Sequence, residues 1–281
     1  MPFDAKSGPL VCHSAERDLA RPVAFVRSAL TDLRDSVHVA GSLFRAMLRA
    51  RHRHAGLGYL WLVIPGIATA AACMAMRAGH VIVIGATDLP YPVFAVTGMF
   101  LWQGMAEAVT LPMQQLAAHR RFLSRMPVPH ESVVLASCGE VALNTAVRLA
   151  VLLLLLVGFG VPISTGWLAV PVAAAVMMAI GLAVGSCLAP FALLVDDVAR
   201  AVSLLLNFAL FLTPVFYPLP GNSPLALNPV VPVLDLARSA LAGHPVAVRP
   251  VALVMTGAIV LMSAGWLQYR VARLHLMARA G

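Results

Sequence analysis

The chain has 281 residues, of which 60% are hydrophobic and 11% charged, with a formal net charge of +8 and a mean hydropathy of +0.86. Soluble domains carry about 25% charged residues, so this composition excludes an ordinary soluble domain and predicts an integral membrane protein. The basic residues lie beside apolar segments and no aromatic-basic RNA motif is present. We therefore assign the positive charge to membrane topology and lipid headgroups, and expect no nucleic acid partner.

Residues 1–56 are expected to form an uncleaved cytoplasmic segment, because the first 30 residues lack the apolar core of a secretory signal peptide. Apolar residues then recur at the i, i+3, i+4 spacing of a helix with a polar opposite face: Ala40, Leu43, Phe44, Met47 and Leu48. This pattern predicts an amphipathic helix in the membrane surface, or alternatively a soluble helix packed on a partner. The basic residues Arg49, Arg51 and Arg53 follow, and then Tyr59 and Trp61. We interpret them as a cytoplasmic anchor and an interfacial aromatic pair.

Six segments are candidates for membrane-spanning helices, each of which needs about 20 mostly apolar residues. They run from Leu57 to Met76, Tyr91 to Leu111, Val133 to Phe159, Trp167 to Leu188, Ala201 to Leu219 and Val251 to Tyr269. The predicted fold class is an all-α integral membrane protein, with residues 57–281 as a six-helix transmembrane domain. Arginine is concentrated before the first span, between the second and third, and after the sixth, which places both termini in the cytoplasm.

The connection between the second and third spans, residues 114–133, is short and basic. Arg120, Arg121 and Arg125 precede Pro127 and Pro129, and these prolines would end a small helix before the third span. Arg121 and Arg125 are four residues apart, so they would share a face suited to an acidic groove. The alternative is an ordinary basic loop on the cytoplasmic side.

Polar residues interrupt the second and third spans. Glu140, Asn144 and Arg148 follow one another at steps of four residues, so they lie on one stripe of the third helix. Charges in hydrocarbon are costly and normally face a bundle interior or water. Three interpretations stay open: a structural seam between helices, the lining of a conduit, or a proton relay. Glu107 in the second span is a plausible neighbour of Glu140 or partner for a basic residue.

Aromatic and small residues mark two further features of the spans. Aromatic rings could stack on the apolar faces of sugars, and those on the second and fifth spans include Phe100, Trp102, Phe208, Phe211 and Tyr217. The alternative is that these rings are core or lipid-facing residues. In the fourth span, Gly181 and Gly185 form a small-xxx-small face that is typical of close helix contact.

After the fifth span, five prolines between residues 218 and 232 break the chain repeatedly before an apolar segment resumes. This segment is too short and too broken to cross a membrane. Asp235 and Arg238 are three residues apart and could form an ion pair there.

The motifs together resemble a known family. The segment LGYLWLVIP (57–65) after a basic amphipathic stretch, the six spans, and the run FLTPVFYPLPGNSPLALNPVVPVLDLARSAL (211–241) are similar to the permease of type 2 ATP-binding-cassette exporters, and most similar to its polysaccharide export branch. The residues that carry the likeness after the fifth span are Thr213, Pro214, Tyr217, Asn228, Pro229 and Arg238.

The resemblance implies a homodimer in the bacterial cytoplasmic (inner) membrane, joined to two copies of a nucleotide-binding ATPase subunit, that exports a lipid-linked polysaccharide such as O-antigen or capsule. It also implies two short re-entrant helices before the last span. Headgroup entrance is assigned to Arg49, Arg51, Arg53, Tyr59 and Trp61; the conduit to Phe100, Trp102, Glu107, Glu140, Asn144, Arg148, Phe208, Phe211 and Tyr217; the gate to Asn228, Pro229, Asp235 and Arg238; and ATPase coupling to Arg120, Arg121, Arg125 and Pro127.

The chain itself is not expected to be an enzyme. A P-loop needs a glycine-rich lead and a lysine, and the only lysine is Lys6, in DAKSG. ATP and magnesium would therefore be bound by the partner subunit, and no cofactor or metal is expected here. A membrane-embedded transferase is the rival from another class, suggested by Asp196, Asp197 and Arg200. This chain has no second acidic cluster of the kind that the metal ions of such an enzyme would need. The two aspartates are more simply a cap for the fifth span.

Two further alternatives concern the cargo. The same fold could export a drug, haem or lipid, but the connection between the first and second spans, residues 77–91, is too short for the large external domain of many drug exporters. A passive channel is the other alternative, and it would need no ATPase.

Overall fold

The computed structural model describes residues 36–49, 60–79, 87–118, 130–195, 197–219 and 223–280, and within these ranges every regular element is helical. An amino-terminal helix covers residues 36–49. The elements that follow are α3 (Leu60–Ala78), α4 (Tyr91–Ala118), α6 (His130–Gly158), the 3-10 turn η1 (Thr165–Leu168), α7 (Ala169–Leu194), α8 (Asp197–Leu212), the 3-10 turn η2 (Pro224–Leu227), α9 (Val231–Leu241) and α10 (Val248–Ala280).

The predicted all-helical fold is confirmed for these ranges, and each of the six predicted spans overlaps one helix. Among the described residues, three helical stretches are long and apolar enough to cross a membrane: Glu131–Gly158, Thr165–Leu194 and Val248–Tyr269. The apolar part of α3, Leu60–Met76, is shorter. The count of six spans therefore stays a prediction.

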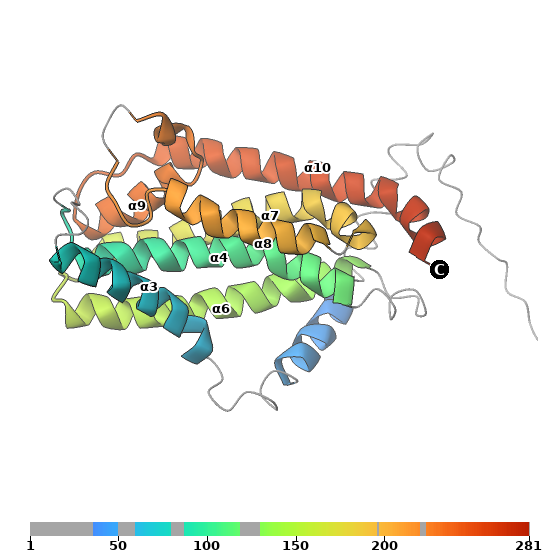
Figure 1. Cartoon of the computed structure of the whole chain (residues 1–281), viewed down its shortest axis with the longest axis horizontal. Helices are drawn as coiled ribbons and strands as arrows, with labels where there is room; N and C mark the ends of the chain where they lie inside the picture. The colour runs from blue at the N-terminus through green and yellow to red at the C-terminus, as the bar shows by residue number, and fades with distance from the viewer. Residues whose placement is uncertain are drawn as a thin grey trace, which may run out of the picture.

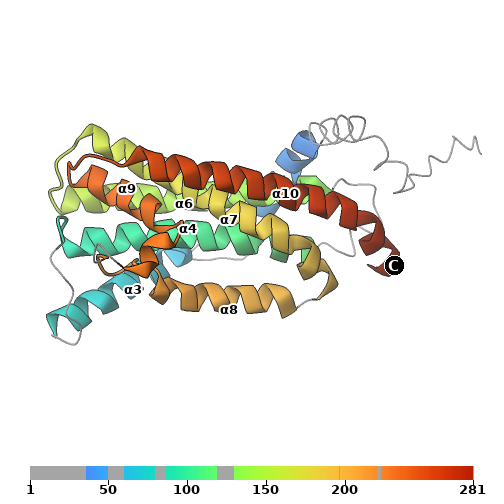
Figure 2. The same ribbon diagram turned by 90° about the horizontal axis from the view of Figure 1, so that it is seen from above.

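The long helices run side by side, with α4 at the centre of the bundle (Figure 1). Helix α4 packs most extensively on α7 and α6, and α7 packs in turn on α10. Seen from above, α8 runs alongside α4 and α7, and α9 lies at the end of the bundle opposite the carboxyl end of α10 (Figure 2). The core between these helices is apolar and includes Phe100, Leu101, Leu152 and Met177, each at most 2% exposed.

Glycine makes the closest helix contact possible. A Cβ atom added at Gly181 of α7 would overlap the carbonyl oxygen of Met105 on α4 and come within 2.6 Å of the Ala108 Cβ. One turn along, a Cβ at Gly185 would lie 2.8 Å from the carbonyl oxygen of Val109. The small-xxx-small face predicted from the sequence is thus confirmed as the α4–α7 contact.

The fifth helix differs from the predicted span. The span was expected from Ala201 to Leu219, whereas α8 begins at Asp197 and ends at Leu212. The early end has a local cause, because Pro214 has no N–H to donate and disfavours helical conformation in Thr213 before it. Two short helical elements, η2 and α9, then precede α10, as expected. Their position relative to a membrane stays a prediction.

The predicted amphipathic helix is present at residues 36–49. Leu43 packs beside the buried cluster of Leu116, Val133 and Ala189, at the ends of α4, α6 and α7. Arg45 and Arg49 are exposed on its other side. The amino-terminal helix and the carboxyl end of α10 lie toward the same end of the bundle, opposite α9 (Figure 1).

Candidate functional site

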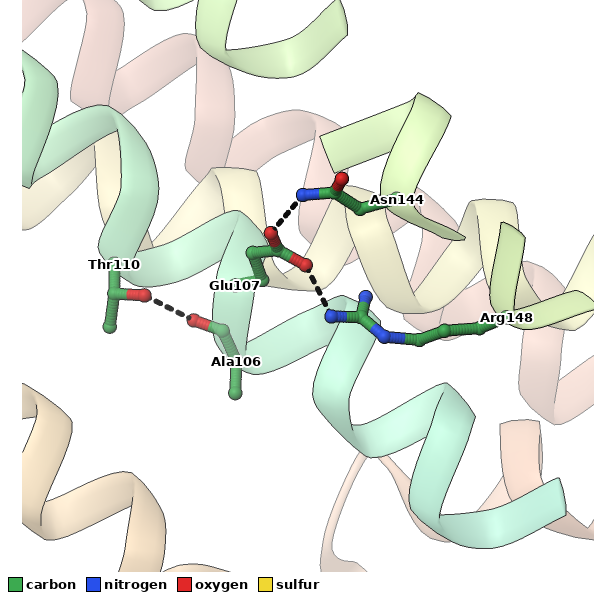
Figure 3. Close-up of polar contacts among 5 residues, drawn as sticks. All are labelled: Ala106, Glu107, Thr110, Asn144 and Arg148. Carbon is green, nitrogen blue, oxygen red and sulfur yellow. Dashed lines mark hydrogen bonds and ion pairs between the residues drawn. The ribbon is translucent and has the colours of Figure 1, made fainter. Parts of the chain in front are cut away.

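Two polar clusters lie inside the bundle, and the first joins α4 to α6. The Glu107 carboxylate of α4 accepts a hydrogen bond from the Asn144 side-chain amide and pairs with the Arg148 guanidinium, whose Nη2 is 2.7 Å from Oε2 (Figure 3). Asn144 is fully buried and Arg148 is 5% exposed. The sequence placed Asn144 and Arg148 on one stripe and proposed Glu107 as partner for a basic residue, and the structure confirms both.

This pairing compensates a buried charge. An arginine removed from water is strongly unfavourable unless a carboxylate and further hydrogen bonds accompany it. Glu107 supplies the carboxylate and Asn144 holds that carboxylate from a second direction. The cluster is therefore a seam between α4 and α6, which agrees with the structural interpretation among the three that the sequence left open. Its role in a conduit stays a prediction.

The seam has unused hydrogen-bonding capacity. Among the described residues, four buried atoms near it have no hydrogen-bond partner: Gln103 Oε1, Thr145 Oγ1, and Nε and Nη1 of Arg148. Glu140 lies one turn before Asn144 and is half-buried. Such atoms are costly in hydrocarbon, so the seam offers places for water or for another polar group.

The second cluster lies at the end of the bundle formed by α9. Arg238 of α9 is only 8% exposed. Its guanidinium donates to the carbonyl oxygens of Pro214 (2.9 Å) and Val215 (2.6 Å), and at 3.4 Å to that of Phe94 on α4. The guanidinium carbon also lies 3.6 Å from the centroid of the Phe94 ring, which is a cation–π geometry. One side chain thus connects α9, α4 and the chain after α8.

The position of Arg238 corrects one expectation. The sequence spacing suggested an ion pair with Asp235, but the guanidinium is directed to backbone carbonyls. Asp235 acts on it as a nearby charge, and the direct ion pairs found among the described residues do not include this one. The reason is local, because the chain after α8 leaves carbonyl oxygens without helical donors, and a buried cation satisfies them.

The two proline motifs of the 211–241 segment are brought together. The Asn228 amide donates to the Thr213 hydroxyl (3.2 Å), and its oxygen accepts from the Val230 backbone N–H (3.0 Å). Tyr217 donates from its hydroxyl to the carbonyl oxygens of Phe211 and Leu212, each at 3.3 Å. The end of α8 is therefore tied to the segment before α9, while Pro229 is exposed.

The sequence analysis missed one member of this cluster. The Tyr91 hydroxyl donates to the carbonyl oxygen of Phe216 at 3.2 Å, so the start of α4 also holds the chain after α8. A tyrosine at the first position of a predicted span was the available signal, and an interfacial position would have accounted for it equally well.

The aromatic residues divide into two groups. Phe100 and Trp102 are 2% and 5% exposed in the α4 core, which favours the core interpretation for both. Phe208 and Phe211 are 68% and 65% exposed on α8, so their rings are accessible in the single chain. Their stacking on a sugar chain stays a prediction.

The remaining predicted residues lie away from the α9 end of the bundle or outside the described ranges. Arg49 is exposed at the end of the amino-terminal helix, and Trp61 of α3 is 62% exposed. The residues outside the described ranges are Arg51, Arg53, Tyr59, Arg120, Arg121, Arg125 and Pro127. Asp197 lies in the first turn of α8, where a carboxylate is favoured, and pairs with Arg200 at 3.0 Å. Asp196, the other half of the predicted cap, lies outside the described residues.

Comparison with known proteins finds no matching family model. The chain is similar to the O-antigen export system permease protein RfbA of Klebsiella pneumoniae, with 25% identity over 171 residues. The aligned region covers 60% of this chain and 65% of that relative, slightly less than two thirds of its length. The similarity supports the resemblance to type 2 ATP-binding-cassette permeases that the sequence motifs indicate.

Proposed function

We propose that the chain is the transmembrane permease subunit of an ATP-driven exporter that moves a lipid-linked polysaccharide across the bacterial cytoplasmic membrane. The similarity to the O-antigen export permease carries this proposal. The hydrogen bond between Thr213 and Asn228 supports it, because it joins the two proline motifs on which the family resemblance rests.

The proposed assembly is a homodimer with two copies of a separate ATPase subunit. In it, α3, α4, α6, α7, α8 and α10 are the six spans, and both termini are cytoplasmic. The common location of the amino-terminal helix and the carboxyl end of α10 supports this orientation. The basic connection around Arg121 and Arg125 is the proposed contact with the ATPase.

The proposed path begins at the cytoplasmic interface, where Arg49, Arg51 and Arg53 would attract a phosphate or pyrophosphate headgroup. It continues between the two copies, along the exposed rings of Phe208 and Phe211. At the outer end, η2 and α9 would cap the path, with Asn228 and Arg238 holding the cap in place.

Co-purification tests the class of protein. The tagged chain is purified from its native membrane in mild detergent, and its companions are identified by mass spectrometry. A stoichiometric P-loop ATPase is the expected result. A dimeric permease without an ATPase would contradict the proposal and favour a channel or an enzyme.

Deletion of the gene tests the cargo. We expect loss of a surface polysaccharide and accumulation of its lipid-linked form inside the cell, restored by the wild-type chain. Normal surface polysaccharide combined with loss of haem, lipid or drug export would assign the same fold to another cargo.

A triple change, Arg49→Gln with Arg51→Gln and Arg53→Gln, tests the headgroup role. Export should fall while membrane insertion and co-purification of the ATPase are retained, because the changes remove charge from the proposed entrance. Arg45→Gln, one turn before Arg49 on the exposed side of the same helix, is the matched control. Undiminished export in the triple variant would reject the headgroup role.

A further inference from the structure

Gly98 of α4 makes room for the Arg238 guanidinium. A Cβ atom added at Gly98 would overlap Nη2 of Arg238 and would lie 2.7 Å from the Val215 carbonyl oxygen. One turn earlier on the same face, Phe94 contributes its ring and its carbonyl oxygen to the same guanidinium. Helix α4 therefore forms one side of a cradle that requires glycine at position 98.

The chain after α8 forms the other side of the cradle. The carbonyl oxygens of Pro214 and Val215 both accept from Arg238, at 2.9 and 2.6 Å. Because α8 ends at Leu212, these oxygens lack helical donors, and a cation beside the carboxyl end of a helix is also favoured by the helix dipole. The guanidinium thus holds three elements in one arrangement.

A second partner for Arg238 lies beside this cradle. A cavity of about 200 Å³ is lined by Arg238, Asp235 and Ser239 of α9, together with Phe94, Pro214 and Tyr217 among others. Asp235 precedes Arg238 by three residues, so both side chains lie on one side of α9. The cavity, which Asp88 also lines, therefore offers the guanidinium a second position beside Asp235, in which its charge would still be compensated.

We propose that Gly98, Arg238 and Asp235 form a two-position lock at the α9 end of the bundle. With Arg238 on the carbonyl oxygens, α9 is held against α4 and the chain after α8, and this end is closed. With Arg238 on Asp235, α9 is released from α4. That release opens the path for the exported chain, a step which rests on the proposed function.

The lock predicts opposite effects for two substitutions. Gly98→Ala displaces the guanidinium from the carbonyl oxygens and favours release. Asp235→Asn removes the alternative partner and favours the closed position. Arg238→Lys also favours release, because a single ammonium cannot reach three carbonyl oxygens in the planar geometry of a guanidinium.

Accessibility of a thiol at position 97 tests the lock. Thr97 is fully buried on α4, and Thr97→Cys is introduced into the full-length chain after its native cysteines are changed to alanine (Cys12, Cys73, Cys138 and Cys187). The rate of reaction with a membrane-impermeant maleimide is measured on intact cells. Gly257→Ala on α10 is the matched control, because a Cβ added there meets no atom within 4 Å.

We expect Gly98→Ala and Arg238→Lys to raise the labelling rate by about tenfold or more, the change that follows from losing one hydrogen bond to a charged group. Asp235→Asn should lower the rate, and Gly257→Ala should leave it unchanged. Unchanged rates in both Gly98→Ala and Arg238→Lys would overturn the proposal. An increase in Asp235→Asn, or an equal increase in Gly257→Ala, would overturn it as well.

The labelling rate can be interpreted independently of folding defects and of transport activity. Only variants that elute as the parent does in gel filtration are scored, and Gly98→Ala and Arg238→Lys reach the same state by independent changes. The labelling needs neither ATPase nor substrate, so it decides the lock even if the co-purification experiment rejects the transporter. Loss of export in Gly98→Ala or Arg238→Lys at the parental labelling rate would contradict the lock and would leave the proposed transporter function standing.

Discussion

Two faces of helix α4 hold their neighbours by different chemistry. Toward α7 the contact is apolar and close, since Gly181 and Gly185 allow the helix backbones to meet at Met105 and Val109. Toward α6 the contact is polar, through the ion pair of Glu107 with Arg148. A small-residue contact tolerates no added volume, whereas a buried ion pair tolerates no loss of one partner. The two faces should therefore fail under opposite kinds of substitution.

The largest effect is expected when one partner of the ion pair on the polar face loses its charge and the other keeps it. Glu107→Gln leaves the Arg148 guanidinium buried without a carboxylate, which should lower the free energy of unfolding by about 3–5 kcal/mol. Thermal unfolding of the purified protein in detergent measures this. The double variant Glu107→Gln with Arg148→Met removes both charges and should recover much of the loss. Equal destabilisation in the single and double variants would contradict the pairing.

The next largest effect is expected from adding volume on the apolar face. Gly181→Leu places a side chain where the Met105 carbonyl oxygen and the Ala108 Cβ already lie. Overpacking of this kind costs about 1–3 kcal/mol, with a correspondingly lower unfolding temperature. Gly257→Leu on α10 is the matched control, since open space surrounds that glycine. Similar losses in both variants would show that helix propensity or detergent contact, and not the α4–α7 contact, sets the cost.

The smallest effect is expected from Thr145→Val, which tests whether the polar contact between α4 and α6 contains water. Thr145 is 5% exposed and its hydroxyl has no hydrogen-bond partner among the described residues. In a dry seam, Thr145→Val should be neutral or should stabilise the protein by up to about 1 kcal/mol, because it removes an unsatisfied polar atom of similar shape. Thr110→Val is the matched control, because it is the same substitution at a threonine whose hydroxyl donates to the Ala106 carbonyl oxygen. Destabilisation by Thr145→Val beyond that of Thr110→Val would indicate that water occupies the seam.

The contrast between the two faces also explains what could be predicted from the sequence. Helix positions follow from local hydrophobicity, and the stripe of Asn144 and Arg148 and the pair Gly181 and Gly185 follow from helical periodicity. The partners of these residues lie on other helices, so periodicity alone could not choose between Glu107 and other acceptors for Arg148.

The α9 end was predicted least well, for a physical reason. The apolar composition continues past Leu212, so hydrophobicity extended the fifth span to Leu219, although Pro214 carried the signal for an earlier end. Arg238 was given a side-chain partner because spacing along a helix reveals side-chain neighbours but not backbone carbonyl oxygens left by another element. Gly98 could not be distinguished from the other glycines of the spans.

The early end of α8 has a consequence for the surrounding lipid. Its 16 residues extend about 24 Å at 1.5 Å per residue, against about 30 Å for the hydrocarbon of a typical bilayer. As a span, α8 would be mismatched to that thickness, and the bilayer beside it must become thinner or a neighbouring protein surface must cover the difference. If α8 is a span, acyl-chain length would therefore act on the end of α8 and, through the Pro214 and Val215 carbonyl oxygens, on Arg238.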